Sequence, residues 1–310
     1  MKKEEFVFES HDGITNIRAV RYIPEETRCI LQIAHGMVEF IDRYEGFAKF
    51  LCDRGFLVTG HDHLGHGGSV IDESKWGYFA KDDGNRCLIE DMHSLTLITK
   101  EMYPDIPYFL MGHSMGSFYT RQYLIDYSDE LNGCIIMGTG SPGKIAATMG
   151  MNICKVMALF KGWEYRSDMV NNIVMGSYNA QFKPNRTSVD WLTKDEAVCD
   201  WYLSEPRCTF VFTLNAFCNM FKGISRLYDK ELLKKMEKRL PVYFVSGDKD
   251  PVGNNGKGVK EAYDSFIEAG MIDAEMKLFE NDRHEILNET DKEDVYEDIF
   301  NWISGKLRLR

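Results

Sequence analysis

A serine flanked by two glycines is the strongest candidate nucleophile in this sequence. Residues 112–116 read Gly-His-Ser-Met-Gly, after a short apolar run at residues 107–111 and before a helical pattern at residues 118–124. A serine on the sharp turn between a strand and a helix forms a nucleophile elbow, where the glycines avoid clashes that a Cβ would cause. The helix N-terminus that follows also favours an oxyanion there. An ordinary turn can match the same pattern, but this context predicts Ser114 as a nucleophile.

A nucleophilic serine needs a general base, and the base needs a carboxylate that orients it. In enzymes built around such an elbow, the acid and then the base follow the serine along the chain. His284 is the only histidine after His113, and it comes in a loop just after an apolar strand pattern that ends at Phe279. If this order holds, His284 is the base by elimination.

The acid is expected at the tip of the preceding strand, where residues 247–252 read Gly-Asp-Lys-Asp-Pro-Val. Asp248 comes almost directly off the strand, and Asp250 lies further along the turn beside Pro251. Both could also be ordinary turn aspartates. The elbow and the histidine stand in the right order around them, which favours an acid here and leaves both positions open.

Catalysis through an acyl-enzyme also requires hydrogen-bond donors for the oxyanion, each worth roughly 3–4 kcal/mol. The backbone N–H of Met115, immediately after the nucleophile, is one candidate. The second should come from the loop after an early strand, where residues 35–37 read His-Gly-Met. We expect the N–H of Met37 to serve, with Gly36 allowing the backbone to turn inward.

A group of histidines at residues 61–66, His-Asp-His-Leu-Gly-His, could be taken for a metal site. A metal hydrolase would require an aspartate at position 65, but Gly65 has no side chain. We therefore expect no metal ion and no organic cofactor, and we expect these histidines to shape a loop at the rim of the site.

Strand and helix patterns alternate along most of the chain, which predicts a mainly parallel sheet with helices on both faces. The strand patterns fall at residues 6–9, 17–22, 29–34, 56–59, 108–111, 133–137, 240–245 and 274–279. Sites in such sheets gather beyond the C-terminal strand ends. The alternation stops near residue 141 and resumes at residue 240. We expect residues 1–141 and 239–310 to form the core domain and residues 142–238 to form an inserted helical lid (cap).

Composition excludes several classes of partner. The net charge of −11 over 310 residues argues against nucleic acid, whose phosphates would repel the protein. No apolar signal region and no run long enough to span a bilayer is present, so we expect no integral membrane segment. The 8 cysteines lie far apart, without a Cys-x-x-Cys pair, as buried thiols in a reducing cytoplasm do. We therefore expect a cytoplasmic protein.

Five motifs in this order resemble the monoglyceride lipase and lysophospholipase branch of the α/β-hydrolases, in its bacterial form. They are residues 35–37, 62–67, 112–116, 247–252 and 283–285, and residues 186–196 are similar to the lid of bacterial members. The resemblance implies the α/β-hydrolase fold, with Ser114 as nucleophile, Asp250 as acid, His284 as base, and Met37 and Met115 as oxyanion donors. It selects Asp250 over Asp248 because the family's acid is the fourth residue of Gly-x-x-Asp. The chain departs from the family at residues 38–42, where a second glycine and a histidine are common.

The resemblance implies a serine hydrolase that cleaves a lipid-like carboxylester with one acyl chain, a monoacylglycerol or a lysophospholipid. A proline-iminopeptidase-like aminopeptidase with the same fold and triad is the alternative. It would need lid carboxylates that bind a substrate amine, and the candidates are Glu164, Asp168, Asp195 and Glu205. A binding protein of this fold without turnover is a further alternative, which the complete triad argues against. The oligomeric state stays open.

Large apolar residues are abundant in the lid, and we expect them to divide between two environments. At least half should form the lid's own core and its seam with the main domain, and the remainder should face the cleft above Ser114. These residues are Met157, Leu159, Phe160, Trp163, Phe182, Trp191, Trp201, Tyr202, Phe210, Phe212, Phe217 and Phe221.

Overall fold

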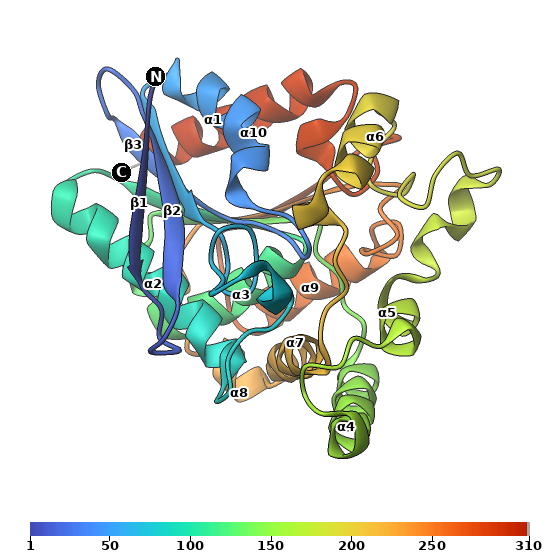
Figure 1. The fold of residues 1–310 in the computed structure, drawn as a ribbon. Helices are drawn as coiled ribbons and strands as arrows, with labels where there is room; N and C mark the ends of the chain where they lie inside the picture. Colours follow the sequence, from blue (N-terminus) through green and yellow to red (C-terminus); the bar gives the residue numbers. More distant parts are fainter. Residues whose placement is uncertain (309–310) are drawn as a thin grey trace.

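The computed structural model describes residues 1–308, and an eight-stranded sheet runs through its centre (Figure 1). The strands are β1 Lys2–Glu9, β2 Asn16–Ile23, β3 Cys29–Ala34, β4 Phe56–His61, β5 Tyr108–His113, β6 Gly133–Met137, β7 Val242–Gly247 and β8 Ala274–Phe279. Their order across the sheet is β1-β2-β4-β3-β5-β6-β7-β8. The β1–β2 and β2–β4 pairs are antiparallel and all other pairs are parallel. The predicted mainly parallel sheet of an α/β-hydrolase is confirmed.

Helices cover both faces of the sheet. In Figure 1, α1 and α10 lie on one side of it, and α2, α3 and α9 lie on the other. These helices are α1 Glu45–Cys52, α2 Gly84–Met102, α3 Met115–Tyr127, α9 Lys257–Glu268 and α10 Lys292–Arg308. Successive side chains of a strand point to opposite faces. Tyr108 and Leu110 of β5 accordingly join the buried cluster under α2 and α3, while Phe109 and Met111 join the cluster under α1 and α10.

The segment between β6 and β7, residues 138–241, has a different character, and we call it the β6–β7 segment. It is entirely within the described part of the chain and holds helices and turns, with one isolated bridge between Arg166 and Thr213. Its helices are α4 Lys144–Lys161, α5 Asp168–Met175, α6 Glu196–Ser204, α7 Leu214–Arg226 and α8 Lys230–Leu233. Helix α7 packs against α2 and α3, and Phe217 on it is fully buried. Helix α4 packs on α7 and lies away from the sheet in Figure 1.

The register of the parallel strands places the candidate residues at one edge of the sheet. Gly112 on β5 pairs with Ala34 on β3, and His113 pairs with Met137 on β6. The elbow therefore begins where both neighbouring strands end. The turn after β7 and the loop after β8 leave the sheet at the same edge, because parallel strands end on one side.

No helix within residues 1–308 is both long and apolar enough to cross a membrane. The 8 cysteines all belong to the described residues, and each is a free, buried thiol. This confirms the expectation that they are scattered buried thiols rather than a disulfide framework.

Candidate active site

Ser114 lies on a strained turn between β5 and α3. Its backbone has φ 53° and ψ −119°, a conformation that residues other than glycine adopt rarely and at a cost. The flanking glycines are needed for close packing. A Cβ on Gly112 would lie 2.2 Å from Thr120 Oγ1, and a Cβ on Gly116 would lie 2.1 Å from the carbonyl oxygen of Ala34. The turn therefore presses against β3 and the following helix, and it holds the serine in one position.

The structure brings Ser114, His284 and Asp250 into one chain of hydrogen bonds. His284 Nε2 lies 2.8 Å from Ser114 Oγ, and His284 Nδ1 lies 3.0 Å from Asp250 Oδ2. His284 and Asp250 are buried, whereas Ser114 remains partly accessible. Asp250 also accepts hydrogen bonds from Ser246 Oγ at 3.0 Å and from the backbone N–H of Val252 at 2.9 Å. This arrangement can transfer a proton from the serine hydroxyl to the imidazole and can stabilise the imidazolium that results.

The two aspartates of the turn after β7 have different surroundings. Asp248 Oδ1 accepts a hydrogen bond of 2.8 Å from the backbone N–H of Asn281, and Lys249 Nζ lies 3.0 Å from its Oδ2. Asp248 therefore fastens one loop to another near the surface, while Asp250 is the carboxylate in contact with His284.

The two predicted oxyanion donors belong to backbone segments that lie close to Ser114. Met115 is the first residue of α3, so its N–H has no intrahelical acceptor. The loop after β3 comes close to the serine, because a Cβ on Gly36 would lie 3.1 Å from Ser114 Cβ. Met37 follows directly, and both Met37 and Met115 line the cavity at Ser114. The structure thus places the two backbone segments together.

A buried ionic network under this loop was not predicted from the sequence. Arg43 donates one hydrogen bond of 2.7 Å to Glu39 and two of 2.7 Å to Glu285, the residue next to His284. Burial alone would raise the pKa of Glu39, but a hydrogen bond with His113 and the charge of Arg43 hold that pKa below its ordinary value. Burial lowers the pKa of Arg43, and the two carboxylates outweigh this and raise it. The four-residue spacing of Glu39 and Arg43 is the only feature of the local sequence that indicates this ionic network.

A cavity of about 900 Å³ opens at Ser114 and is lined mainly by apolar side chains of the β6–β7 segment. Its volume falls within the roughly 300–1,000 Å³ of typical small-molecule sites. The large apolar residues that were expected at the cleft and do line it are Trp191, Tyr202, Phe210 and Phe221. The expectation that all the others are buried inside the segment or face the cleft is wrong for some of them. The large side chains that are exposed to solvent instead are Leu159, Phe160, Trp163 and Trp201.

The histidines of residues 61–66 do not shape the rim of the site, contrary to the expectation from the sequence. His61, His63 and His66 are fully buried, and none of them lines the cavity. They pack around His35, whose ring centroid lies 4.3 Å from that of His63. Burial lowers the pKa of His61 to about 3 and that of His66 to about 4. These side chains are therefore neutral core residues beside the oxyanion loop.

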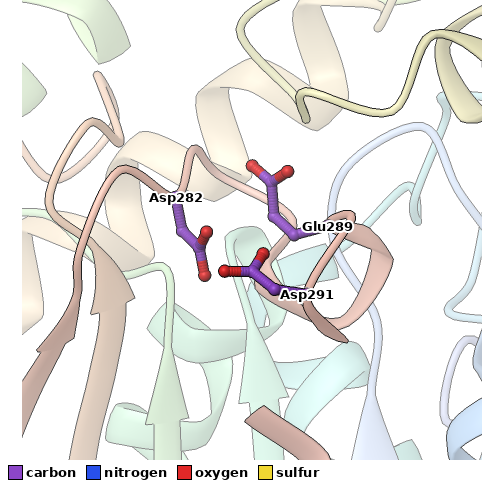
Figure 2. Close-up of side chains that lie close together, drawn as sticks. All are labelled: Asp282, Glu289 and Asp291. Carbon is purple, nitrogen blue, oxygen red and sulfur yellow. The ribbon is translucent and has the colours of Figure 1, made fainter. Parts of the chain in front are cut away.

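Only one group of side chains in residues 1–308 could hold a metal ion, and an ammonium already lies among them. One carboxylate oxygen from each of Asp282, Glu289 and Asp291 lies within 4.8 Å of the others. In Figure 2, Asp282 and Asp291 point toward each other, while the Glu289 carboxylate points toward the top of the view. Lys194 Nζ lies 2.7 Å from Asp282, 3.4 Å from Asp291 and 3.9 Å from Glu289. The lysine supplies the positive charge that these carboxylates require. The group therefore joins the β6–β7 segment to the loop that carries His284.

The lid carboxylates that an aminopeptidase would need have other contacts. Glu164 pairs with Lys75, Asp195 caps the N-terminus of α6, and Glu205 pairs with Arg207. Of the described residues that line the cavity, none is one of these three, and Asp168 is also absent from the lining. The acidic side chains at the cavity are Glu39 and Glu285, and both are already paired with Arg43.

Several known hydrolases are similar to this chain in sequence and in structure. The family described as serine aminopeptidase, S33, matches residues 25–291. Monoglyceride lipase from Mus musculus is 24% identical over 291 residues, which cover 90% of this chain and 84% of the lipase. Monoacylglycerol lipase from Mycolicibacterium smegmatis is 23% identical, and the match covers 96% of this chain and 97% of that lipase.

The crystal structure of a thermostable carboxyl esterase from Bacillus coagulans, in complex with glycerol, has a TM-score of 0.90 against this structure. The two chains are 29% identical, and the match covers 98% of this chain and 99% of the esterase. These similarities agree with the resemblance to the monoglyceride lipases. The protein is therefore a hydrolase with the α/β-hydrolase fold, and the chain belongs to the serine aminopeptidase S33 family.

Proposed function

We propose that this enzyme hydrolyses carboxylesters with one acyl chain, such as a monoacylglycerol or a lysophospholipid, through an acyl-enzyme on Ser114. One observation carries the proposal. The hydrogen-bonded series Ser114–His284–Asp250 opens directly into a large, mainly apolar cavity. The names of the relatives point to the same class of substrate, since they are lipases of monoglycerides.

The reaction proceeds in two halves. Ser114 Oγ attacks the ester carbonyl carbon while His284 Nε2 takes the hydroxyl proton, and Asp250 stabilises the imidazolium. The backbone N–H groups of Met37 and Met115 donate hydrogen bonds to the oxyanion of the tetrahedral intermediate. His284 then gives its proton to the leaving alcohol. In the second half, His284 activates water, which releases the carboxylic acid and restores Ser114.

Residues 142–238 act in this proposal as a cap over a core made of residues 1–141 and 239–310. The supporting observation is that α4, α5 and α7 all contribute lining residues, among them Ile153, Val174 and Ile224. Apolar walls favour an acyl chain because each buried methylene contributes up to ~0.8 kcal/mol. The value of kcat/KM should therefore rise up to about fourfold per carbon until the cavity is full.

The exposed face of α4 supports a substrate that resides in a lipid aggregate. Ile145, Met149, Val156 and Phe160 follow one side of this helix, with exposures from 57% for Val156 to 83% for Phe160. Such a stripe opposite the buried side of a helix is typical of contact with an apolar surface. Met149 also lines the cavity, so the stripe continues into the site. A lipid surface at this face would place its single-chain esters at the cavity mouth.

A panel of p-nitrophenyl esters of rising chain length, with an aminoacyl p-nitroanilide beside it, tests the proposal. We expect ester cleavage whose kcat/KM climbs from acetate to medium chains, and no cleavage by Ser114→Ala. A fluorophosphonate should label the wild type and leave Ser114→Ala unlabelled. Preferential cleavage of the anilide would favour the aminopeptidase alternative. A profile that peaks at acetate would contradict a substrate with a long acyl chain.

A further inference from the structure

His113, the residue before the proposed nucleophile, lies between two hydrogen-bond acceptors. Its Nδ1 is 3.2 Å from Glu39 Oε1, and its Nε2 is 3.2 Å from the backbone carbonyl oxygen of His284. The side chain is buried, and each ring nitrogen has one protein partner within hydrogen-bond distance. A carbonyl oxygen can only accept a hydrogen bond, and an ionised carboxylate has the same restriction.

The carboxylate of Glu39 is an acceptor for every group that faces it. The backbone N–H of Gly36 and the hydroxyl of Tyr44 both donate to its Oε1. The guanidinium of Arg43 donates to its Oε2 at 2.7 Å. A protonated Glu39 could give its proton only to His113 Nδ1, and this would leave a neutral carboxyl beside the buried guanidinium of Arg43. The charge of Arg43 and the donors Gly36 N–H and Tyr44 O–H favour the ionised carboxylate, so His113 Nδ1 donates to it.

A neutral imidazole carries only one N–H and cannot satisfy both acceptors. We propose that His113 is an imidazolium in the active enzyme, and that it acts with Glu39 as a positioning residue for the loops of the catalytic site. The positioning role rests on the proposed function, whereas the protonation state does not. The bond from Nε2 to His284 holds the loop of the base, and the bond from Gly36 to Glu39 holds the loop of Met37.

Charge balance independently supports this protonation state. The groups that face His113 are Glu39 and Tyr44 from the segment after β3, and His284 and Glu285 from the loop after β8. Glu39 and Glu285 carry two buried negative charges, and Arg43, which pairs with both, supplies only one positive charge. One negative charge is left without a partner. An unpaired buried charge is costly, and a charged His113 removes it.

The electrostatic surroundings act in the same direction. Burial by itself lowers the pKa of His113, but the hydrogen bond with Glu39 and the charges of Glu39 and Glu285 outweigh it and raise that pKa above its ordinary value. Because the folded-state pKa is raised, the stabilisation is present below the ordinary histidine pKa and is lost as pH rises through the folded value. The two positioning bonds should therefore weaken on the alkaline side.

Nitrogen NMR of the full-length enzyme with 15N-labelled histidine tests the inference directly. We expect both ring nitrogens of His113 to be protonated at pH 7, with the signals assigned by their loss in His113→Gln. A single protonated nitrogen at this pH would overturn the inference. The measurement needs no substrate, so it remains decisive if the proposed ester hydrolysis fails.

Two variants separate the positioning role from general stability. Glu39→Gln removes the negative charge that raises the pKa of His113, so the alkaline limb of the kcat profile should move to lower pH, with a smaller change in KM. Tyr44→Phe removes a hydrogen bond to the same carboxylate and keeps its charge, so His113 should stay doubly protonated and the limb should not move. Identical pH profiles for Glu39→Gln and the wild type would contradict the role. If Glu39→Gln does not fold, the NMR of the wild type and of Tyr44→Phe still decides the protonation state.

Discussion

The carbonyl oxygen of Leu192 accepts a hydrogen bond of 2.7 Å from the backbone N–H of Glu285, the residue that follows His284. Arg283, just before His284, donates to the carbonyl oxygen of Thr193 at 3.1 Å. The β6–β7 segment is thus attached to the loop of the proposed base from both sides. A change in this segment can therefore shift the base as well as the walls of the cavity.

Ion pairs of Lys194 also attach the β6–β7 segment to the loop of the proposed base. Removal of this lysine should weaken the attachment. Lys194→Met leaves Asp282 and Glu289, both buried, without their ammonium. Because the lysine is partly exposed, we expect a smaller loss than the roughly 3–5 kcal/mol of a fully buried pair. Urea unfolding of the two proteins measures it. Lys249→Met is the matched control, since its pair with Asp248 is more exposed and should contribute at most about 1 kcal/mol.

The same variant distinguishes a lysine-filled site from a metal site. Calcium should leave the melting temperature of the wild type unchanged, because Lys194 already occupies the space between the carboxylates of Figure 2. In Lys194→Met, calcium should recover part of the lost stability. Calcium-dependent stabilisation of the wild type would show that the carboxylates bind a cation despite the lysine.

The acid of the proposed triad can be identified by one pair of substitutions. Asp250→Asn removes the charge that contacts His284, and should lower kcat by roughly 10⁴-fold, as the equivalent change does in a serine protease. Asp248→Asn alters a bond to Asn281 near the surface and should cost far less. Steady-state kinetics on one ester gives both values, and the opposite ranking would reject Asp250.

The buried histidines predict how stability depends on pH. The pKa of His61 is lowered by burial to about 3, so this side chain stays neutral in the folded protein and takes up a proton on unfolding in mild acid. A depressed pKa contributes stability above the unfolded value, and that stability is lost as pH falls toward the folded value. His61→Gln should therefore reduce the slope of unfolding free energy against pH by about 1.4 kcal/mol per unit near pH 5. Urea titrations between pH 7 and pH 5 measure the slope, and equal slopes would contradict the argument.

The central strands β3 and β6 could be predicted closely because both of their faces are covered, and their bounds are the same in the structure as in their sequence patterns. The edge strand β8 also has the predicted bounds. β4 and β5 continue two residues further, through Gly60 and His61 and through Gly112 and His113. These residues are glycines and histidines, which do not continue the apolar pattern, so periodicity alone ends each strand too early.

Contacts over long sequence separations could not be predicted in the same way. Glu39 and Arg43 are four residues apart, but Glu285 lies 242 residues beyond Arg43, and only the folded chain unites them. The histidines near His61 were misplaced because polar side chains are usually at the surface, whereas the close packing with His35 and the aromatic residues buries them. The order of the Ser, Asp and His motifs, by contrast, indicated side chains that the structure does bring together.

Helix α4 shows why the buried residues of the β6–β7 segment were harder to predict from the sequence. It carries apolar residues around most of its circumference, apart from a narrow polar strip of Lys144, Thr148, Asn152 and Lys155, so its sequence does not reveal which apolar side is buried. Small residues, Ala147, Gly150 and Cys154, pack toward the protein, and the large Leu159 and Phe160 face outward. The usual assumption that the largest apolar side chains are buried is therefore reversed here.

Substitutions on the exposed face of α4 can test whether this face contacts lipid, with an exposed apolar residue elsewhere on the molecule as the control. The double variant Leu159→Ser, Phe160→Ser removes two side chains that are 81% and 83% exposed. Full burial of one such side chain is worth about 1.5–3 kcal/mol, so partial burial of two in a lipid surface should change binding by on the order of tenfold or more. Ile272→Ser is the control, because Ile272 is 73% exposed in the loop between α9 and β8, outside the β6–β7 segment.

Two measurements on each variant decide whether α4 meets a lipid surface. We expect the double variant to sediment less with phosphatidylcholine vesicles that contain a monoacylglycerol, and to cleave that lipid more slowly. Cleavage of dissolved p-nitrophenyl butyrate should stay near the wild-type rate, because the triad and the oxyanion loop are unchanged. Ile272→Ser should match the wild type in both assays. Equal vesicle binding by all three proteins would remove the lipid-surface role of α4, and an equal loss on the dissolved ester would assign the defect to the cap's structure instead.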